Sequence, residues 1–182
     1  TDTITYTVRD PAGATATTVV TVTVYAKPVN TLPAIPELKV FQSQTLVFSA
    51  ANPLPGAITV ADPDSTHLRV VLSVTNGTLR VGGTNGITFG DGVSVGTNTS
   101  GTNTLVLSGA VAVLNAALEG LAYTPATNYF GADFLRVITT DEGGRQDVDN
   151  TGVRILVEVL TLGGVPSVSL QALNDPASGR TL

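Results

Sequence analysis

Two aspartates at alternate positions, Asp62 and Asp64, are the side chains of this sequence best suited to binding chemistry. They flank Pro63 and precede Ser65, between two stretches that read as strands. Calcium takes six to eight oxygen ligands, and two carboxylates at alternate positions of a turn can point into one hollow. The same residue types also form ordinary turns in solvent. The pattern therefore leaves a calcium site and a solvated turn as alternatives.

Three further oxygen-bearing side chains join this candidate site if the strand order is that of an immunoglobulin-like sandwich. The loop that carries Asp141 and Glu142 then lies at the same end as Asp62 and Asp64, where Asn30 of the incoming chain also arrives. Carboxylates gathered without a cation repel one another, which favours a bound ion. We therefore predict Ca²⁺ ligands at Asp62, Asp64, Asp141, Asn30 and Glu142.

Two other acidic positions are expected to lie in solvent. Asp147 and Asp149 also alternate, but the segment lacks the sixth-position glycine and the distal glutamate of an EF-hand loop. We expect a solvated hairpin loop there.

Catalytic chemistry has little support in the sequence. The single histidine, His67, follows the aspartate turn, and Ser65 is too near in sequence to form a normal triad with it. Catalysis would need a cleft in which His67 meets Asp62 or Asp64 beside a Ser or Thr. The chain has no Cys and no Trp, so thiolate chemistry and a tryptophan platform for sugars are absent. We expect that the protein is not an enzyme.

Charge and hydropathy exclude two classes of partner. The 182 residues carry a net charge of -5, so an electrostatic nucleic-acid footprint is not expected. No apolar run approaches the roughly 18 residues that a membrane span needs, and membrane insertion is not expected.

The first 26 residues predict a β-hairpin followed by a stiff connection. Apolar and polar residues alternate on both sides of a turn at 11–13, which is typical of two half-buried strands. Prolines recur through 27–37, where each removes a backbone donor, so we expect an extended linker.

The remaining sequence predicts a sandwich of short strands with one helix. Leu114 and Leu118 have helical spacing, with Ser108 as the expected cap and Gly120 near the end, so we place a helix at about 109–119. The fold class is all-β, an Ig/cadherin-like antiparallel β-sandwich with Greek-key connections. The expected strands are 38–49, 57–61, 67–75, 78–82, 87–89, 103–108, 133–140 and 153–160.

An internal repeat with a shift of 131 residues divides the chain. It places Asp2–Asp10 on Asp133–Asp141, and Gly13 on Gly144. Residues 1–26 are therefore interpreted as the C-terminal hairpin of a preceding repeat, and 27–37 as a linker. Residues 38–160 form a complete module, with an end near 173 as the alternative. Residues 161–182 are either a last strand or the start of the next linker.

Six short motifs are specific enough to suggest a family. They are Asp62-x-Asp64-Ser65, Asn76-Gly77-Thr78-Leu79, Leu114-Asn115-Ala116-Ala117-Leu118, Tyr123-Thr124-Pro125, Asn128-Tyr129-x-Gly131, and Asp141 before Gly143-Gly144.

This pattern resembles the bacterial cadherin-like and chondroitin-sulfate-proteoglycan-type tandem repeats of large surface or secreted, adhesin-like proteins. The resemblance implies a non-enzymatic structural or adhesive module at the cell surface, stiffened by calcium near the inter-module junction. Its partners would be neighbouring repeats of the same chain and a host glycan or protein, and we expect a monomer. The alternative is a β-sandwich module that binds carbohydrate or a host protein. One departure is Thr31, where such linkers usually carry an aspartate.

Overall fold

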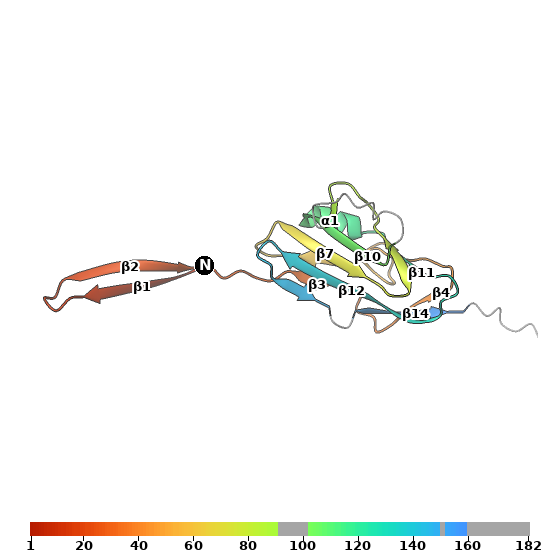
Figure 1. Ribbon diagram of the computed structural model, residues 1–182, viewed down its shortest axis with the longest axis horizontal. Coiled ribbons are helices and arrows are strands. Elements are labelled where there is room, and N and C mark those ends of the chain that lie inside the picture. Colours follow the sequence, from red (N-terminus) through yellow and green to blue (C-terminus); the bar gives the residue numbers. More distant parts are fainter. Residues whose placement is uncertain (91–101, 150–151, 160–182) are drawn as a thin grey trace, which may run out of the picture.

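The chain begins with a β-hairpin that lies apart from the other strands (Figure 1). The computed structural model describes residues 1–90, 102–149 and 152–159. Strand β1 (Asp2–Arg9) pairs antiparallel with β2 (Thr15–Val22), and every residue of both strands is exposed. Gly13 in the turn has a φ of 97°, a conformation that glycine adopts without steric cost.

Among the described residues, the larger sheet of the sandwich contains seven strands, including β7 and β12. Its strand order is β4-β14-β12-β7-β10-β9, and β13 (Gln146–Val148) pairs with the end of β12. Only the β4–β14 pair in this sheet is parallel, and β12 bends from β14 onto β7 along its length. The other bounds are β4 (Leu38–Phe41), β14 (Val153–Glu158), β12 (Gly131–Asp141), β7 (His67–Ser73), β10 (Thr104–Ala110) and β9 (Thr88–Phe89).

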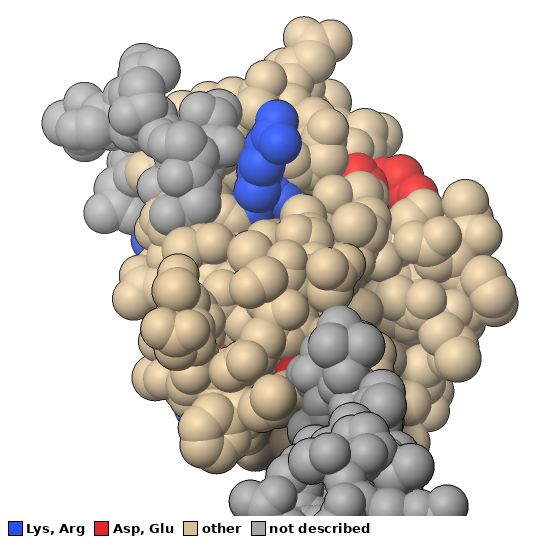
Figure 2. All heavy atoms as spheres, turned by 90° about the vertical axis from the view of Figure 1, so that its right-hand side faces the viewer, with Lys and Arg blue, Asp and Glu red and all other residues tan. Residues whose placement is uncertain are grey.

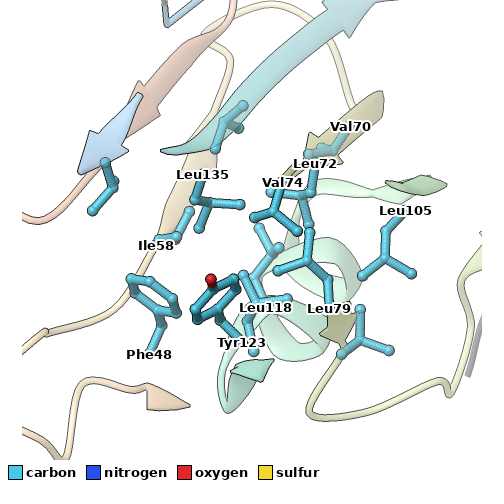
Figure 3. Close-up of a cluster of buried hydrophobic side chains, with 14 of the residues drawn as sticks. Phe48, Ile58, Val70, Leu72, Val74, Leu79, Leu105, Leu118, Tyr123 and Leu135 are labelled. Carbon is cyan, nitrogen blue, oxygen red and sulfur yellow. The ribbon is translucent and has the colours of Figure 1, made fainter. Parts of the chain in front are cut away.

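A three-stranded sheet faces the larger one and closes the core. Its order is β5 (Leu46–Phe48), β11 (Leu121–Pro125) and β8 (Gly77–Arg80). Tyr123 of β11 is fully buried and lies among the side chains of Phe48, Leu118 and Leu135 (Figure 3). Residues alternate between buried and exposed along β4 and β12, which is the pattern of strands with one face on a core.

The helix α1 (Val111–Leu118) covers one end of the core (Figure 1). Its placement confirms the predicted helix, but the predicted cap is wrong. Ser108 belongs to β10, and Ala110 takes the cap position without a side-chain hydrogen bond. Gly120, with a φ of 82°, ends the turn after the helix as expected.

The proline-rich segment contributes a strand of its own. Strand β3 (Val29–Thr31) pairs antiparallel with β6 (Thr59–Ala61), while Leu32 and Ile35 pack against the core. The structure confirms the all-β sandwich. It divides the expected strand 38–49 into β4 and β5, and adds β3, β11 and β13, which the sequence did not predict. The expected last strand or linker at 161–182 lies outside the described residues.

Candidate functional site

The incoming chain is gripped at one end of the sandwich by two loops. The N–H of Ala26 donates to Oδ2 of Asp64, at 2.8 Å, in the loop before β7. The carbonyl of the same residue accepts from Nε of Arg145, also at 2.8 Å, in the turn between β12 and β13. Both backbone polar groups of Ala26 are thus held by charged side chains, which form the stronger class of hydrogen bonds.

Arg145 is the cation at the centre of this grip. Its Nε lies 2.7 Å from Oδ2 of Asp141, whose side chain has no exposed surface. The Nε–H points at the carbonyl of Ala26, so Oδ2 is ion-paired but lacks a well-directed hydrogen bond. Oδ1 of Asp141 accepts the Arg145 backbone N–H at 2.8 Å, and the guanidinium lies 4.8 Å from the ring centre of Tyr25. Cation–π contact of this kind adds to the hold on the linker.

Asp147 of β13 holds the next two contacts along the linker. Its carboxylate lies 2.8 Å from Nζ of Lys27 and accepts the N–H of Asn30 at 2.8 Å. The hydrogen bond from the Lys27 ammonium, together with the Asn30 N–H, holds the pKa of Asp147 below its usual value. The Asn30 side chain then ties β3 to β12, because Oδ1 accepts the Thr139 hydroxyl at 2.5 Å and Nδ2 donates to the Val137 carbonyl at 3.4 Å.

Asp62 shapes the loop that presents Asp64. Its Oδ1 accepts the N–H groups of Asp64 at 2.9 Å and of Ser65 at 2.8 Å, which is an Asx turn. Burial raises the pKa of Asp62, but these two N–H groups and the Arg145 charge outweigh burial, so the pKa lies below its usual value. The carboxylate therefore stays ionised at neutral pH.

We call this arrangement the linker clamp. It consists of Asp62, Asp64, Asp141, Arg145 and Asp147, acting on residues 25–30. The opposite end of the sandwich, turned toward the viewer in Figure 2, shows mostly uncharged side chains over its described part.

The five predicted calcium ligands all lie at the linker end, and in four of them, all but Glu142, one side-chain oxygen already accepts a hydrogen bond from the protein. Glu142 is 59% exposed and its Oε1 lies 3.8 Å from Nδ1 of His67. Within the described residues, no group of three or more acidic or histidine side chains is arranged to hold a metal. Oδ2 of Asp62 and Oδ2 of Asp141 are buried without a hydrogen-bond partner. Calcium binding at this end stays a prediction.

Arg145, Asp147 and Lys27 were missed by the sequence reasoning. Asp147 was expected to lie in solvent, whereas it binds two linker residues. One signal was available, because Arg145 directly follows the glycine turn that begins at Asp141. A carboxylate and a guanidinium four residues apart across a tight turn are natural ion-pair partners.

Fold and site together define a β-sandwich domain that binds its own incoming chain mainly through hydrogen bonds between charged side chains and the backbone of that chain. A family model described as Protein GAMETE EXPRESSED 2 domain matches residues 58–150, and the chain belongs to this family. No curated protein sequence matches the chain. The single helix in the described part of the chain is too short to cross a membrane.

The family match corrects the resemblance drawn from the motifs. The family is one of eukaryotic gamete proteins, so the identification as a bacterial cadherin-like repeat is wrong. The functions that rested on it, a calcium-stiffened bacterial adhesive repeat or a bacterial module for host glycans and proteins, are withdrawn with it. Short turn and strand motifs recur among β-sandwiches because the same backbone geometry needs the same residues, so they misled on the family.

Proposed function

We propose that the chain is a non-enzymatic domain of an extracellular, gamete-expressed protein, and that it fixes the direction of the segment that precedes it. The observation that carries this proposal is the double hold on Ala26, by Asp64 and by Arg145. The family description supports expression in gametes.

The geometry suits an orienting role because the clamp reaches almost to the hairpin. Strand β2 ends at Val22, and Tyr25 already lies against the Arg145 guanidinium. Only Thr23 and Val24 separate the two, so few backbone dihedrals are free to bend. Hydrogen bonds to ionised groups contribute about 1.5–3 kcal/mol each when buried, and less at this partly exposed site.

The surroundings of His67 support the absence of catalysis. His67 is 62% exposed, with Thr66 at 3.1 Å and Glu142 at 3.8 Å. An open groove of about 300 Å³ runs beside it, and neither Asp62 nor Asp64 lines this groove. The pairing of His67 with Asp62 or Asp64 that the sequence analysis required for catalysis is therefore not assembled in this groove.

Distances between two spin labels test the orienting role directly. The chain has no cysteine, so the Thr21→Cys and Arg80→Cys pair labels the hairpin and the sandwich without background. Both positions are exposed. We expect a narrow distance distribution that broadens when Arg145→Gln removes the contacts to Ala26 and Asp141.

The matched control is Arg154→Gln, which removes an arginine paired with Glu37 outside the clamp. It should leave the distribution narrow. A distribution that is already broad before Arg145 is changed would refute the orienting role. Repeating the measurement in millimolar calcium and in chelator tests the metal, because a further narrowing that is specific to calcium and lost in Asp62→Asn would add an ion to the clamp.

A further inference from the structure

One apolar face of the hairpin β1–β2 has nothing packed on it within the part of the chain that the structure describes. Ile4, Tyr6 and Val8 alternate along β1, and Val20 and Val22 lie on the same face of β2. These five side chains are 39–58% exposed. A two-stranded hairpin is marginally stable by itself, and becomes stable when such a face is packed.

The turn of this hairpin repeats the β12–β13 turn bond for bond. In each, the aspartate (Asp10 or Asp141) accepts the N–H of the residue four positions later through Oδ1, at 2.8 Å. Its own N–H donates to the carbonyl of that residue, at 2.9 and 3.0 Å. Its carbonyl accepts from the glycine three positions later, at 3.0 and 3.1 Å.

The strands that flank the two turns also share one register. Residues 7–9 pair with 15–17 in the way that 138–140 pair with 146–148. Every member of the first set is 131 residues before its counterpart. The hairpin β1–β2 therefore has the same turn and strand pairing as β12 and β13 of the sandwich.

Burial is what separates the two copies. The counterparts of the three apolar β1 residues are Leu135, Val137 and Thr139, and all three are 0% exposed. Leu135 lies near Tyr123 of the facing sheet (Figure 3), and the Thr139 hydroxyl donates to Asn30 of β3. The same face is covered in one copy and open in the other. The layer that covers β12 consists of β-strands, which identifies the kind of partner that fits the hairpin.

Asp2 gives this partner a specific chemistry. Its Oδ1 accepts the N–H of the following residue at 2.8 Å, as does Oδ1 of its counterpart Asp133. Asp133 is 1% exposed and also accepts the Tyr123 hydroxyl and the N–H groups of Thr75 and Asn76.

We propose that the apolar face of β1–β2 is covered by the facing sheet of a second β-sandwich, in the part of the polypeptide that precedes Thr1. This sandwich supplies to Asp2 a tyrosine hydroxyl from its facing sheet and two backbone N–H groups from a turn next to that sheet, as Tyr123, Thr75 and Asn76 do for Asp133. The proposal does not depend on the linker clamp, because a loose linker leaves the packing of this face unchanged.

Amide hydrogen exchange of the natural polypeptide and of the 182-residue chain tests the proposal. In the natural polypeptide the β1 and β2 amides should exchange about 100-fold more slowly than in the 182-residue chain, because opening them requires unfolding of the packed sandwich. Exchange of the β7 and β12 amides, inside the sandwich already described, should be the same in both.

Two neighbouring substitutions provide the matched pair. Ile4→Ser changes the apolar face and Thr5→Ser the opposite face of one strand. Ile4→Ser and Asp2→Asn should speed exchange of the hairpin in the natural polypeptide, while Thr5→Ser should not.

Equal exchange of the hairpin in both chains would overturn the proposal, as would a natural polypeptide that begins at Thr1. Protection of the hairpin in a dimer of the 182-residue chain, rising with concentration, would make a second copy the partner and would equally overturn it.

Discussion

Replacing Asp133 with Asn should destabilise the sandwich more than removing any one of its partners. The side chain is 1% exposed, and its two oxygens accept four hydrogen bonds. Oδ1 accepts from the N–H groups of Thr75 at 3.0 Å and Phe134 at 2.8 Å. Oδ2 accepts from the N–H of Asn76 at 2.8 Å and the hydroxyl of Tyr123 at 2.9 Å.

The expected loss follows from how an amide differs from a carboxylate. Asn has one acceptor oxygen, so either orientation of its amide turns an NH₂ group toward two donors. Two hydrogen bonds are lost and the other two lose their charge. At 1.5–3 kcal/mol for each bond to a charged acceptor, Asp133→Asn should cost about 3–6 kcal/mol, a large part of the stability of an ordinary domain.

Tyr123→Phe is the second substitution in this comparison, and its expected cost in stability is smaller. Burial, followed by the hydrogen bond to Asp133, raises the pKa of Tyr123 well above its usual value, so the hydroxyl remains a donor. Removing it takes away one of four bonds and should cost about 1–2 kcal/mol. In the Asp133→Asn background the same change should cost less, because the carboxylate it serves is gone.

Urea unfolding followed by far-ultraviolet circular dichroism measures all four proteins of this double-mutant cycle. The slope of free energy against urea should be unchanged, so that the midpoints report stability. If Asp133→Asn costs no more than Tyr123→Phe, the buried carboxylate does not serve four donors and the reasoning is refuted.

Three further outcomes are expected from the same unfolding measurement. Lys27 and the Asn30 N–H lower the pKa of Asp147 in the folded state, so its carboxylate stabilises the fold at pH values above the ordinary pKa near 3.9. This stabilisation is lost as the pH falls through the pKa of the folded state. The difference in unfolding free energy between the unchanged protein and Asp147→Asn should therefore be constant from pH 5 to 7 and shrink below about pH 4. Asn115→Ala should cost about 1–3 kcal/mol, because the amide both donates to and accepts from the backbone of Val60, at 2.9 and 2.8 Å; an unchanged midpoint would contradict this. Gly82→Ala should destabilise strongly because its Cβ would lie 1.8 Å from a carbonyl oxygen, whereas Gly83→Ala, with 3.7 Å, should be tolerated, and equal effects would refute the steric explanation.

The strands that could be predicted are those that alternate along one face of the core. Strand β7 reads His67–Ser73, and its buried residues fall at every second position, as its sequence indicates. Strand β3 could not be predicted this way, because its three residues lie in a proline-rich stretch and pair with β6, about 30 positions later in the chain. Pairing at that separation depends on the fold of the sandwich and leaves little local pattern.

Calcium at the linker end stays a prediction, and the sequence analysis missed the side-chain cation that the structure shows there. Asp62 and Asp64 lie in the loop before β7 and Asp141 at the end of β12, but within the described residues no three acidic side chains are arranged to hold a metal. Neighbouring carboxylates repel one another unless a cation lies between them, and the sequence analysis predicted calcium as that cation. In the structure, the Arg145 guanidinium stands against them. The spacing of acidic residues in the sequence indicates that a cation lies nearby, but it does not indicate whether this cation is a metal ion or a basic side chain.

The repeat shows that the linker clamp belongs to this junction and not to the hairpin turn as such. The turns at Asp10 and Asp141 share their backbone hydrogen bonds, so the turn itself is common to both copies. At the positions of Arg145 and Asp147, the first copy has Ala14 and Ala16. Alanine can neither pair with a carboxylate nor bind a linker backbone. The shared turn therefore maintains the fold, while the two charged substitutions within it give one copy the hold on the chain that enters it.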